Sequence, residues 1–144
     1  MTEQHKRIIC LDYGSKTVGV AVTDSLGLTV QPVETIWRES ENKLRRTLAR
    51  IGELIEQYDT DRIVIGLPYN MDDTVGQRGE KALEFAQKIE KRFGIKPIMH
   101  DERLSTESAK EILGEMGITG RESKQYIDKI AAVCILEDYL NERK

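Results

Sequence analysis

The strongest constraint on the fold is a run near the N-terminus that is apolar on both of its alternating faces, Ile8-Ile9-Cys10-Leu11-Asp12-Tyr13. Successive side chains of a strand point to opposite faces, so both faces of this strand need cover. A strand of this kind belongs in the interior of a sheet with packing partners on both sides. The run therefore predicts a central strand over residues 7–13.

Two further strands are expected directly after it. Gly14-Ser15-Lys16-Thr17 separates the first strand from a second β-branched and apolar run over 18–23. A short connection containing glycine favours an antiparallel hairpin. A third strand is expected over 30–37, at a sheet edge, because Pro32 near its start lacks the N–H that an interior strand would use.

The rest of the chain alternates helices and strands. Leu44, Leu48, Ile51, Ile55 and Tyr58 recur at helical spacing and predict an amphipathic helix over about 41–58. Strands over 62–66 and 96–100 and helices over 79–93, 106–116 and 123–143 follow. This order implies an α/β fold with a mixed sheet flanked by helices. Because no repeat or linker interrupts the sequence, we expect one domain over residues 1–144.

Charge and hydropathy narrow the function classes. The chain has 22 Lys and Arg against 25 Asp and Glu, a net charge of −3, which disfavours a non-specific nucleic-acid coat protein. An enzyme that gathers carboxylates at a metal site remains compatible. No apolar run approaches the ~20 residues of a membrane span, and the N-terminus lacks the apolar segment of a secretory signal. We therefore expect a cytoplasmic protein without a membrane partner, with Cys10 and Cys134 as reduced core residues.

Acidic residues stand where core residues are expected. Asp12 closes the first strand on the face of Ile8 and Cys10, where a carboxylate needs hydrogen bonds, a cation or a proton. Capping of the following turn is the competing interpretation and, for Asp12 alone, the preferred one. Asp128 shares a helix face with apolar residues, so it faces the protein body, although a favourable interaction with the helix dipole also explains it.

The adjacent pair Asp101 and Glu102 closes the strand over 96–100. Their side chains point to opposite faces, so one of them at most can join Asp12; two solvated strand-end acids are the competing interpretation. Acids from three elements that should pack together suggest a cluster of oxygen ligands for hard divalent cations. Two such ions about 3.5–4 Å apart suit hydrolysis of a phosphodiester.

Four segments resemble motifs of the YqgF/RuvX family of RNase H-like proteins. They are Leu11-Asp12-Tyr13-Gly14-Ser15-Lys16-Thr17-Val18-Gly19-Val20-Ala21, Gly66-Leu67-Pro68-Tyr69-Asn70-Met71-Asp72, Asp101-Glu102-Arg103-Leu104-Ser105-Thr106 and Asp128-Lys129-Ile130-Ala131-Ala132. They appear in the family's order and span nearly the whole chain. In one departure, Asp73 stands where the family's central loop has a glycine; Asp tolerates unusual backbone angles better than most residues.

The resemblance implies an RNase H-like fold, with three antiparallel strands followed by two parallel ones. It implies that Asp12, Glu102 and Asp128 are catalytic and bind Mg²⁺ or Mn²⁺. Of the two adjacent acids, the resemblance therefore prefers Glu102 over Asp101. It also implies a nuclease that processes the 5′ end of precursor 16S ribosomal RNA in ribosome biogenesis or, by older analogy, resolves branched DNA at Holliday junctions.

Nucleic-acid contacts are assigned to individual residues on weaker grounds. Lys16 at the hairpin tip, Arg103 and Asn70 are candidate contacts, although Lys16 is also an ordinary turn lysine and Arg103 equally an ion-pair partner. The cluster Lys43, Arg45, Arg46 and Arg50 is interpreted as a solvated helix face rather than a phosphate-binding surface. Trp37 and the tyrosines form no pattern of a base-stacking platform, and His5 and His100 do not suggest zinc.

Two other function classes remain open. Asp12-Tyr-Gly14 and Gly19 also resemble the phosphate-binding hairpin of actin-like ATPases, but those proteins close two such domains around a nucleotide and 144 residues supply one. A non-catalytic RNA-binding module that retains the fold is the second alternative; unlike a nuclease, it would tolerate loss of the Asp12 carboxylate.

Overall fold

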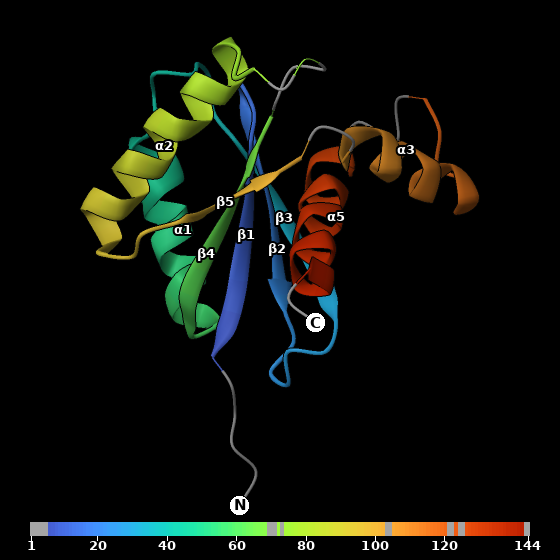
Figure 1. Cartoon of the computed structure of the whole chain (residues 1–144), viewed down its shortest axis with the longest axis horizontal. Coiled ribbons are helices and arrows are strands. Elements are labelled where there is room, and N and C mark those ends of the chain that lie inside the picture. Colours follow the sequence, from blue (N-terminus) through green and yellow to red (C-terminus); the bar gives the residue numbers. More distant parts are fainter. Residues whose placement is uncertain are drawn as a thin grey trace, which may run out of the picture.

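The computed structural model describes residues 6–68, 72, 74–102, 105–120, 123 and 126–142. Within them, five strands form one mixed sheet in the order β3-β2-β1-β4-β5 (Figure 1). The strands are β1 (Arg7–Tyr13), β2 (Thr17–Thr23), β3 (Val30–Trp37), β4 (Thr60–Leu67) and β5 (Ile98–Asp101).

The apolar first strand lies at the centre of the sheet, as predicted. β1 pairs antiparallel with β2 and parallel with β4, while β5 continues the parallel half. β3 pairs antiparallel with β2 and forms one edge. Pro32 lies on this edge strand, as expected, beside a register shift opposite Val20 and Ala21. The predicted pattern of three antiparallel strands followed by two parallel ones is confirmed.

Helices cover both faces of the sheet. α1 (Arg45–Gln57) and α2 (Gln77–Phe93) lie on one face, and α5 (Ile127–Glu142) lies on the other, with α3 (Ser105–Glu115) packed against α5 (Figure 1). α1 begins at Arg45 rather than near residue 41 because its apolar stripe starts at the buried Leu44. Residues 40–43 instead form a turn in which the Lys43 N–H donates to the Ser40 carbonyl at 3.1 Å.

Strand alternation divides the core into two clusters. Ile9 and Leu11 of β1 pack with Ile51, Phe85 and Ile89 of α1 and α2. The opposite face of the sheet carries a second cluster in which side chains of β1, β2 and β4 meet α5, namely Cys10, Ala21, Val64, Ala132, Ile135 and Leu136. Asp12 follows Cys10 by two residues, so the same alternation directs Asp12 toward α5.

None of the helices in the described part of the chain combines the length and apolarity needed to cross a lipid bilayer.

Replacement of Phe85 tests how much the larger core cluster contributes to stability. Its ring is 1% exposed and stacks on Tyr13 with ring centroids 4.4 Å apart. We expect Phe85→Ala to lower the free energy of unfolding by about 3–5 kcal/mol, because it removes a buried ring and leaves a cavity. Urea denaturation measures this change. Leu28→Ala at a 75% exposed position is the control, with an expected change within about 0.5 kcal/mol; equal losses in both variants would contradict this account of the core.

Candidate active site

The predicted acidic residues come from three elements that meet at one end of the sheet. β1, β4 and β5 run parallel, so their C-terminal ends lie at the same end of the sheet. Asp12 is the penultimate residue of β1, Glu102 directly follows β5, and Asp128 is the second residue of α5. All three residues are partly exposed.

Asp12 and Glu102 lie in direct contact. Their carboxyl groups share a hydrogen bond, which requires a proton on one of them. The pKa of Asp12 is well above its usual value, first because surrounding protein desolvates it and then because of the charge and hydrogen bond of Glu102. The Asp128 charge raises the pKa further, while the Arg78 guanidinium opposes the shift. The fold therefore concentrates negative charge at this position.

Gly19 allows α5 to approach Asp12. Gly19 pairs with Asp12 across the β1–β2 ladder. A Cβ atom at Gly19 would lie 2.0 Å from the Asp128 carbonyl oxygen and 2.9 Å from the Lys129 nitrogen, distances that no side chain tolerates. The first turn of α5 therefore rests on the backbone of β2, which brings Asp128 next to Asp12.

Gly66 has the same role for Glu102. It follows Ile65, which pairs with Leu11, so Gly66 lies beside Asp12 across the two parallel strands. A Cβ atom at Gly66 would lie 2.8 Å from Cδ and 3.0 Å from Oε2 of Glu102. The Glu102 N–H donates to the Leu67 carbonyl at 3.2 Å and holds the backbone in place. Of the adjacent acids, Glu102 therefore lies beside Asp12, while the Asp101 side chain is exposed.

Cys10 forms the floor beneath the carboxylates. It is fully buried, and burial, followed by the charges of Asp12 and Glu102, raises the pKa of its thiol well above the usual value. The thiol is therefore protonated at neutral pH and acts as a small apolar core residue. Both Cys10 and Cys134 are free cysteines, as expected.

Of the three predicted nucleic-acid contacts, the structure describes Lys16. Lys16 is exposed in the loop between β1 and β2, and its carbonyl accepts the Arg38 N–H at 2.9 Å. Asn70 and Arg103 lie outside the described residues, as do Asp73 and His5.

Two arginines that the sequence analysis did not single out stand close to the acids. Arg38 and Arg78 place their guanidinium carbons 4.7 Å and 5.7 Å from the centre of the Tyr13 ring. Arg78 also forms a 2.9 Å ion pair with Glu41, which lies outside the helix that was expected to contain it. Tyr13 follows Asp12 in β1 but faces the other side of the sheet. These two arginines therefore lie at the same end of the sheet as the acids, on the opposite face.

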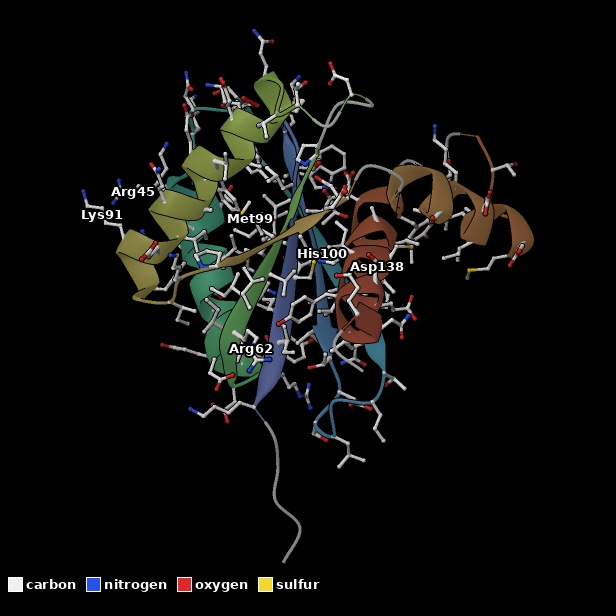
Figure 2. The ribbon with its side chains drawn as sticks, in the orientation of Figure 1. Arg45, Arg62, Lys91, Met99, His100 and Asp138 are labelled. Atoms are coloured by element: carbon white, nitrogen blue, oxygen red, sulfur yellow. The ribbon has the colours of Figure 1, made fainter. Side chains whose placement is uncertain are left out.

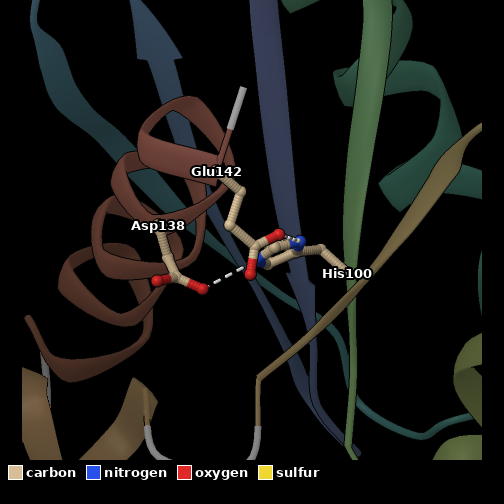
Figure 3. A group of neighbouring side chains, drawn as sticks. All are labelled: His100, Asp138 and Glu142. Atoms are coloured by element: carbon tan, nitrogen blue, oxygen red, sulfur yellow. Dashed lines mark hydrogen bonds and ion pairs between the residues drawn. The ribbon is translucent and has the colours of Figure 1, made fainter. Parts of the chain in front are cut away.

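A second group of possible metal ligands joins β5 to α5. His100 Nε2 lies 2.7 Å from Asp138 Oδ2, and His100 Nδ1 lies 3.7 Å from Glu142 Oε2 (Figure 3). Among the described residues, this is the group whose ligand atoms all lie within 4.8 Å of one another; Asp12, Glu102 and Asp128 spread more widely. The two carboxylates lie at opposite nitrogens of the ring, so the group connects β5, which Glu102 follows directly, to α5, which carries Asp128.

Comparisons with known proteins cover almost the entire chain. A family model described as RuvX, Holliday junction resolvase, matches residues 6–142. A protein of Lachnospira eligens named "Putative pre-16S rRNA nuclease" is 51% identical over 138 residues, which cover 96% of this chain and 99% of the relative. The matched residues 6–142 include all four motifs identified in the sequence.

Solved structures share the fold at low sequence identity. The T. thermophilus RuvC structure in complex with a Holliday junction substrate has a TM-score of 0.59 at 13% identity and covers 96% of both chains. The fowlpox virus Holliday junction resolvase has a TM-score of 0.54 at 15% identity, covering 96% of this chain and 99% of that one. These similarities confirm the predicted RNase H-like fold.

Replacement of Gly19 tests the contact between α5 and β2. We expect Gly19→Ala to lower the free energy of unfolding by at least about 1–3 kcal/mol, because the new methyl group overlaps the Asp128 carbonyl. Chemical denaturation measures the loss. Gly114→Ala in α3 is the matched control, since a Cβ there meets nothing within 4 Å and alanine favours a helix. A Gly19→Ala protein as stable as the control would show that the contact is not tight.

The raised pKa of Asp12 has a consequence for stability. The folded protein binds this proton more tightly than the unfolded chain, so ionisation of Asp12 lowers stability as the pH rises above the unfolded value of about 3.8. Asp12→Asn removes that loss. In EDTA, we expect the variant to be more stable than the parent protein at pH 7, with a difference that shrinks below about pH 4.

Asp24→Asn is the control of opposite sign. The pKa of the exposed Asp24 is lowered, first by the Leu28 N–H and then by the Thr29 hydroxyl. Its ionised form therefore stabilises the fold, and this variant should be less stable than the parent at pH 7. Thermal unfolding from pH 3 to 8 compares the two; Asp12→Asn that destabilises at pH 7 would rule out the crowded-acid description.

Proposed function

The chain belongs to the RuvX family, and on this basis we propose that it is a divalent-metal-dependent nuclease that hydrolyses phosphodiester bonds in structured RNA through Asp12, Glu102 and Asp128. The observation that carries the proposal is the hydrogen-bonded Asp12–Glu102 pair, with a raised Asp12 pKa, at a solvent-accessible sheet edge beside Asp128. Desolvated acids held together in this way are typical of functional sites.

The donor set fits a hard divalent cation. Carboxylate oxygens are the ligands that Mg²⁺ and Mn²⁺ prefer. Because Mg²⁺ keeps several bound waters, the ligand oxygens need not all lie within 4.8 Å of one another. When bound, such ions activate a water molecule and stabilise the leaving oxygen in displacement at phosphorus.

The protein's own groups prepare the site. The hydrogen bond between Asp12 and Glu102 holds the two carboxyl groups side by side, and both would bind a cation in their ionised form. Gly19 and Gly66 admit Asp128 and Glu102 to the edge of the sheet. The Arg78 charge favours the ionised form of Asp12. The same charge would also attract a phosphate group that approaches the acids.

Precursor 16S ribosomal RNA, cut at its 5′ end, is the substrate that we favour. The 51% identical relative carries that substrate in its name, whereas the RuvC complex with a junction is 13% identical and supports only the fold. Holliday-junction resolution is the second candidate, supported by the family's description. A role in ribosome biogenesis would place the protein in the cytoplasm with RNA as its partner.

Direct cleavage assays separate the two substrates. The purified protein would be incubated with Mg²⁺ or Mn²⁺ and either an end-labelled precursor 16S fragment or a labelled four-way DNA junction. We expect cuts near the mature 5′ end of the RNA that EDTA abolishes. Cleavage of the junction without cleavage of the RNA would favour the resolvase.

Single isosteric changes test the acidic residues. We expect Asp12→Asn, Glu102→Gln and Asp128→Asn each to reduce the cleavage rate by more than about a hundredfold, since stabilisation of transition-state charge by a metal is worth several kcal/mol. Asp101→Asn is the matched control, because its exposed side chain lies next to Glu102 in sequence; its rate should stay within a few-fold of the parent. Circular dichroism checks folding. An active, folded Asp12→Asn protein would favour a non-catalytic RNA-binding module.

A further inference from the structure

A cavity of about 680 Å³ lies between the end of β3 and the start of α1. β3 runs in the direction of β1, so the cavity is at the same end of the sheet as Asp12. It lies two strands from β1, a spacing of about 10 Å. The lining residues that matter here are Trp37, Arg38, Glu39, Lys43, Arg45 and Arg46.

The cavity is strongly basic. Its lining includes four cationic side chains and one acid, Glu39, which pairs with Lys43 at 3.1 Å. Arg45 and Arg46 are exposed and form no ion pair or hydrogen bond with any residue that the structure describes. They also occupy the first turn of α1, which contains no acid, so their charges add to the positive end of the helix dipole. An anion in the cavity would reduce the repulsion among these positive charges.

The hydrogen bonding of Arg38 is a second, independent observation at this cavity. It is 9% exposed, and its Nη2 donates to the Gly14 carbonyl, while Nε and Nη1 have no hydrogen-bond partner. The Tyr13 ring beneath the guanidinium and a hydrogen bond between the two side chains satisfy only part of this buried charge. Arg38 therefore adds an incompletely satisfied positive charge to the wall of the cavity, which favours an anion there.

Trp37 supplies an aromatic surface beside these charges. Its side chain is 64% exposed although it is the largest in the chain, and it pairs through its backbone with Thr17 at the end of an edge strand. A single exposed apolar residue is ordinary by itself. An exposed indole in a basic cavity, however, has the two features that bind single-stranded nucleic acid: a stacking surface and cations for the backbone.

We propose that this cavity binds an unpaired nucleotide of the substrate strand, with its base against Trp37 and its phosphate near Arg45 and Arg46. The inference rests on the proposed nuclease function and adds a single-stranded subsite to it. Arg38 lines the cavity and shares the Tyr13 ring with Arg78, whose positive charge favours the ionised form of Asp12. A strand could therefore follow positive charge from the subsite to the acidic site.

The sequence analysis interpreted Lys43, Arg45, Arg46 and Arg50 as one solvated helix face. The proposed subsite divides this cluster. Arg50 of that cluster is engaged elsewhere, with Glu34 at 2.6 Å and Glu53 at 3.2 Å. The other three cations join Trp37 only because β3 ends beside the start of α1.

Trp37 is the only tryptophan in the chain, so its fluorescence reports directly on the subsite. The protein in EDTA would be titrated with a single-stranded ten-nucleotide oligoadenylate RNA, its DNA counterpart and a duplex of equal length. We expect the RNA strand to quench the emission in a saturable manner and the duplex to leave it nearly unchanged. Absence of quenching by the single strand, or equal quenching by the duplex, would overturn the proposal.

Charge variants test the phosphate contacts. We expect Arg45→Gln combined with Arg46→Gln to weaken oligonucleotide binding at least about tenfold and to lower the slope of log K against log salt by roughly 1.4, the value for two phosphate contacts on a single strand. Lys6→Gln combined with Arg62→Gln is the matched control, because both residues stand at the other end of the sheet; Figure 2 shows Arg62 near the start of β4, away from Arg45. Equal losses in both double variants would indicate non-specific attraction only.

Removal of the indole tests stacking. By anisotropy of a fluorescently labelled strand, Trp37→Ala should weaken binding roughly fivefold or more, and Trp37→Phe should retain most of the affinity. An unchanged Trp37→Ala affinity would contradict base stacking. The outcome is separable from that of the proposed nuclease, since binding in EDTA without cleavage in Mg²⁺ would refute only the nuclease, and cleavage without Trp37 quenching would refute only the subsite.

Discussion

The contact of α5 with the backbone of β2 at Gly19 is the constraint on which the candidate active site depends. Helix and strand can approach this closely only because Gly19 has no side chain, and a methyl group there would lie 2.0 Å from the Asp128 carbonyl oxygen. Gly19 is also the residue that pairs with Asp12. One glycine thus sets the separation of two carboxylates that come from opposite ends of the sequence.

The electrostatics of this end of the sheet follow from that packing. On the face covered by α5, desolvation and neighbouring acids raise the Asp12 pKa, which is unfavourable for the folded state at neutral pH. On the opposite face, Arg38 and Arg78 gather around Tyr13, and a basic cavity follows beyond Arg38. The acidic residues that would bind cations and the basic residues that would bind phosphates therefore lie on opposite faces of the same sheet. A net charge of −3 is therefore compatible with nucleic-acid chemistry.

The elements of the fold could be predicted because hydrophobic periodicity reflects local burial. β1 and β3 have the predicted bounds, and the edge position expected from Pro32 is observed. The start of the first helix was less predictable: α1 begins at Arg45, not near residue 41. Charged residues before a helix suit a turn as well as a first helical turn, so periodicity alone does not locate the boundary.

The mixed sheet, the face on which Asp12 lies and the three acids of the candidate site, with Glu102 preferred over Asp101 by resemblance, could be predicted from the chain, because alternation along a strand and the order of recognisable motifs are local properties. The packing adds that Glu102 lies against Asp12, that Gly19 and Gly66 make room for this arrangement, and that Trp37 shares a cavity with Arg38 and Arg45. Those facts depend on distances between residues far apart in the chain, and they follow from packing rather than from any local pattern.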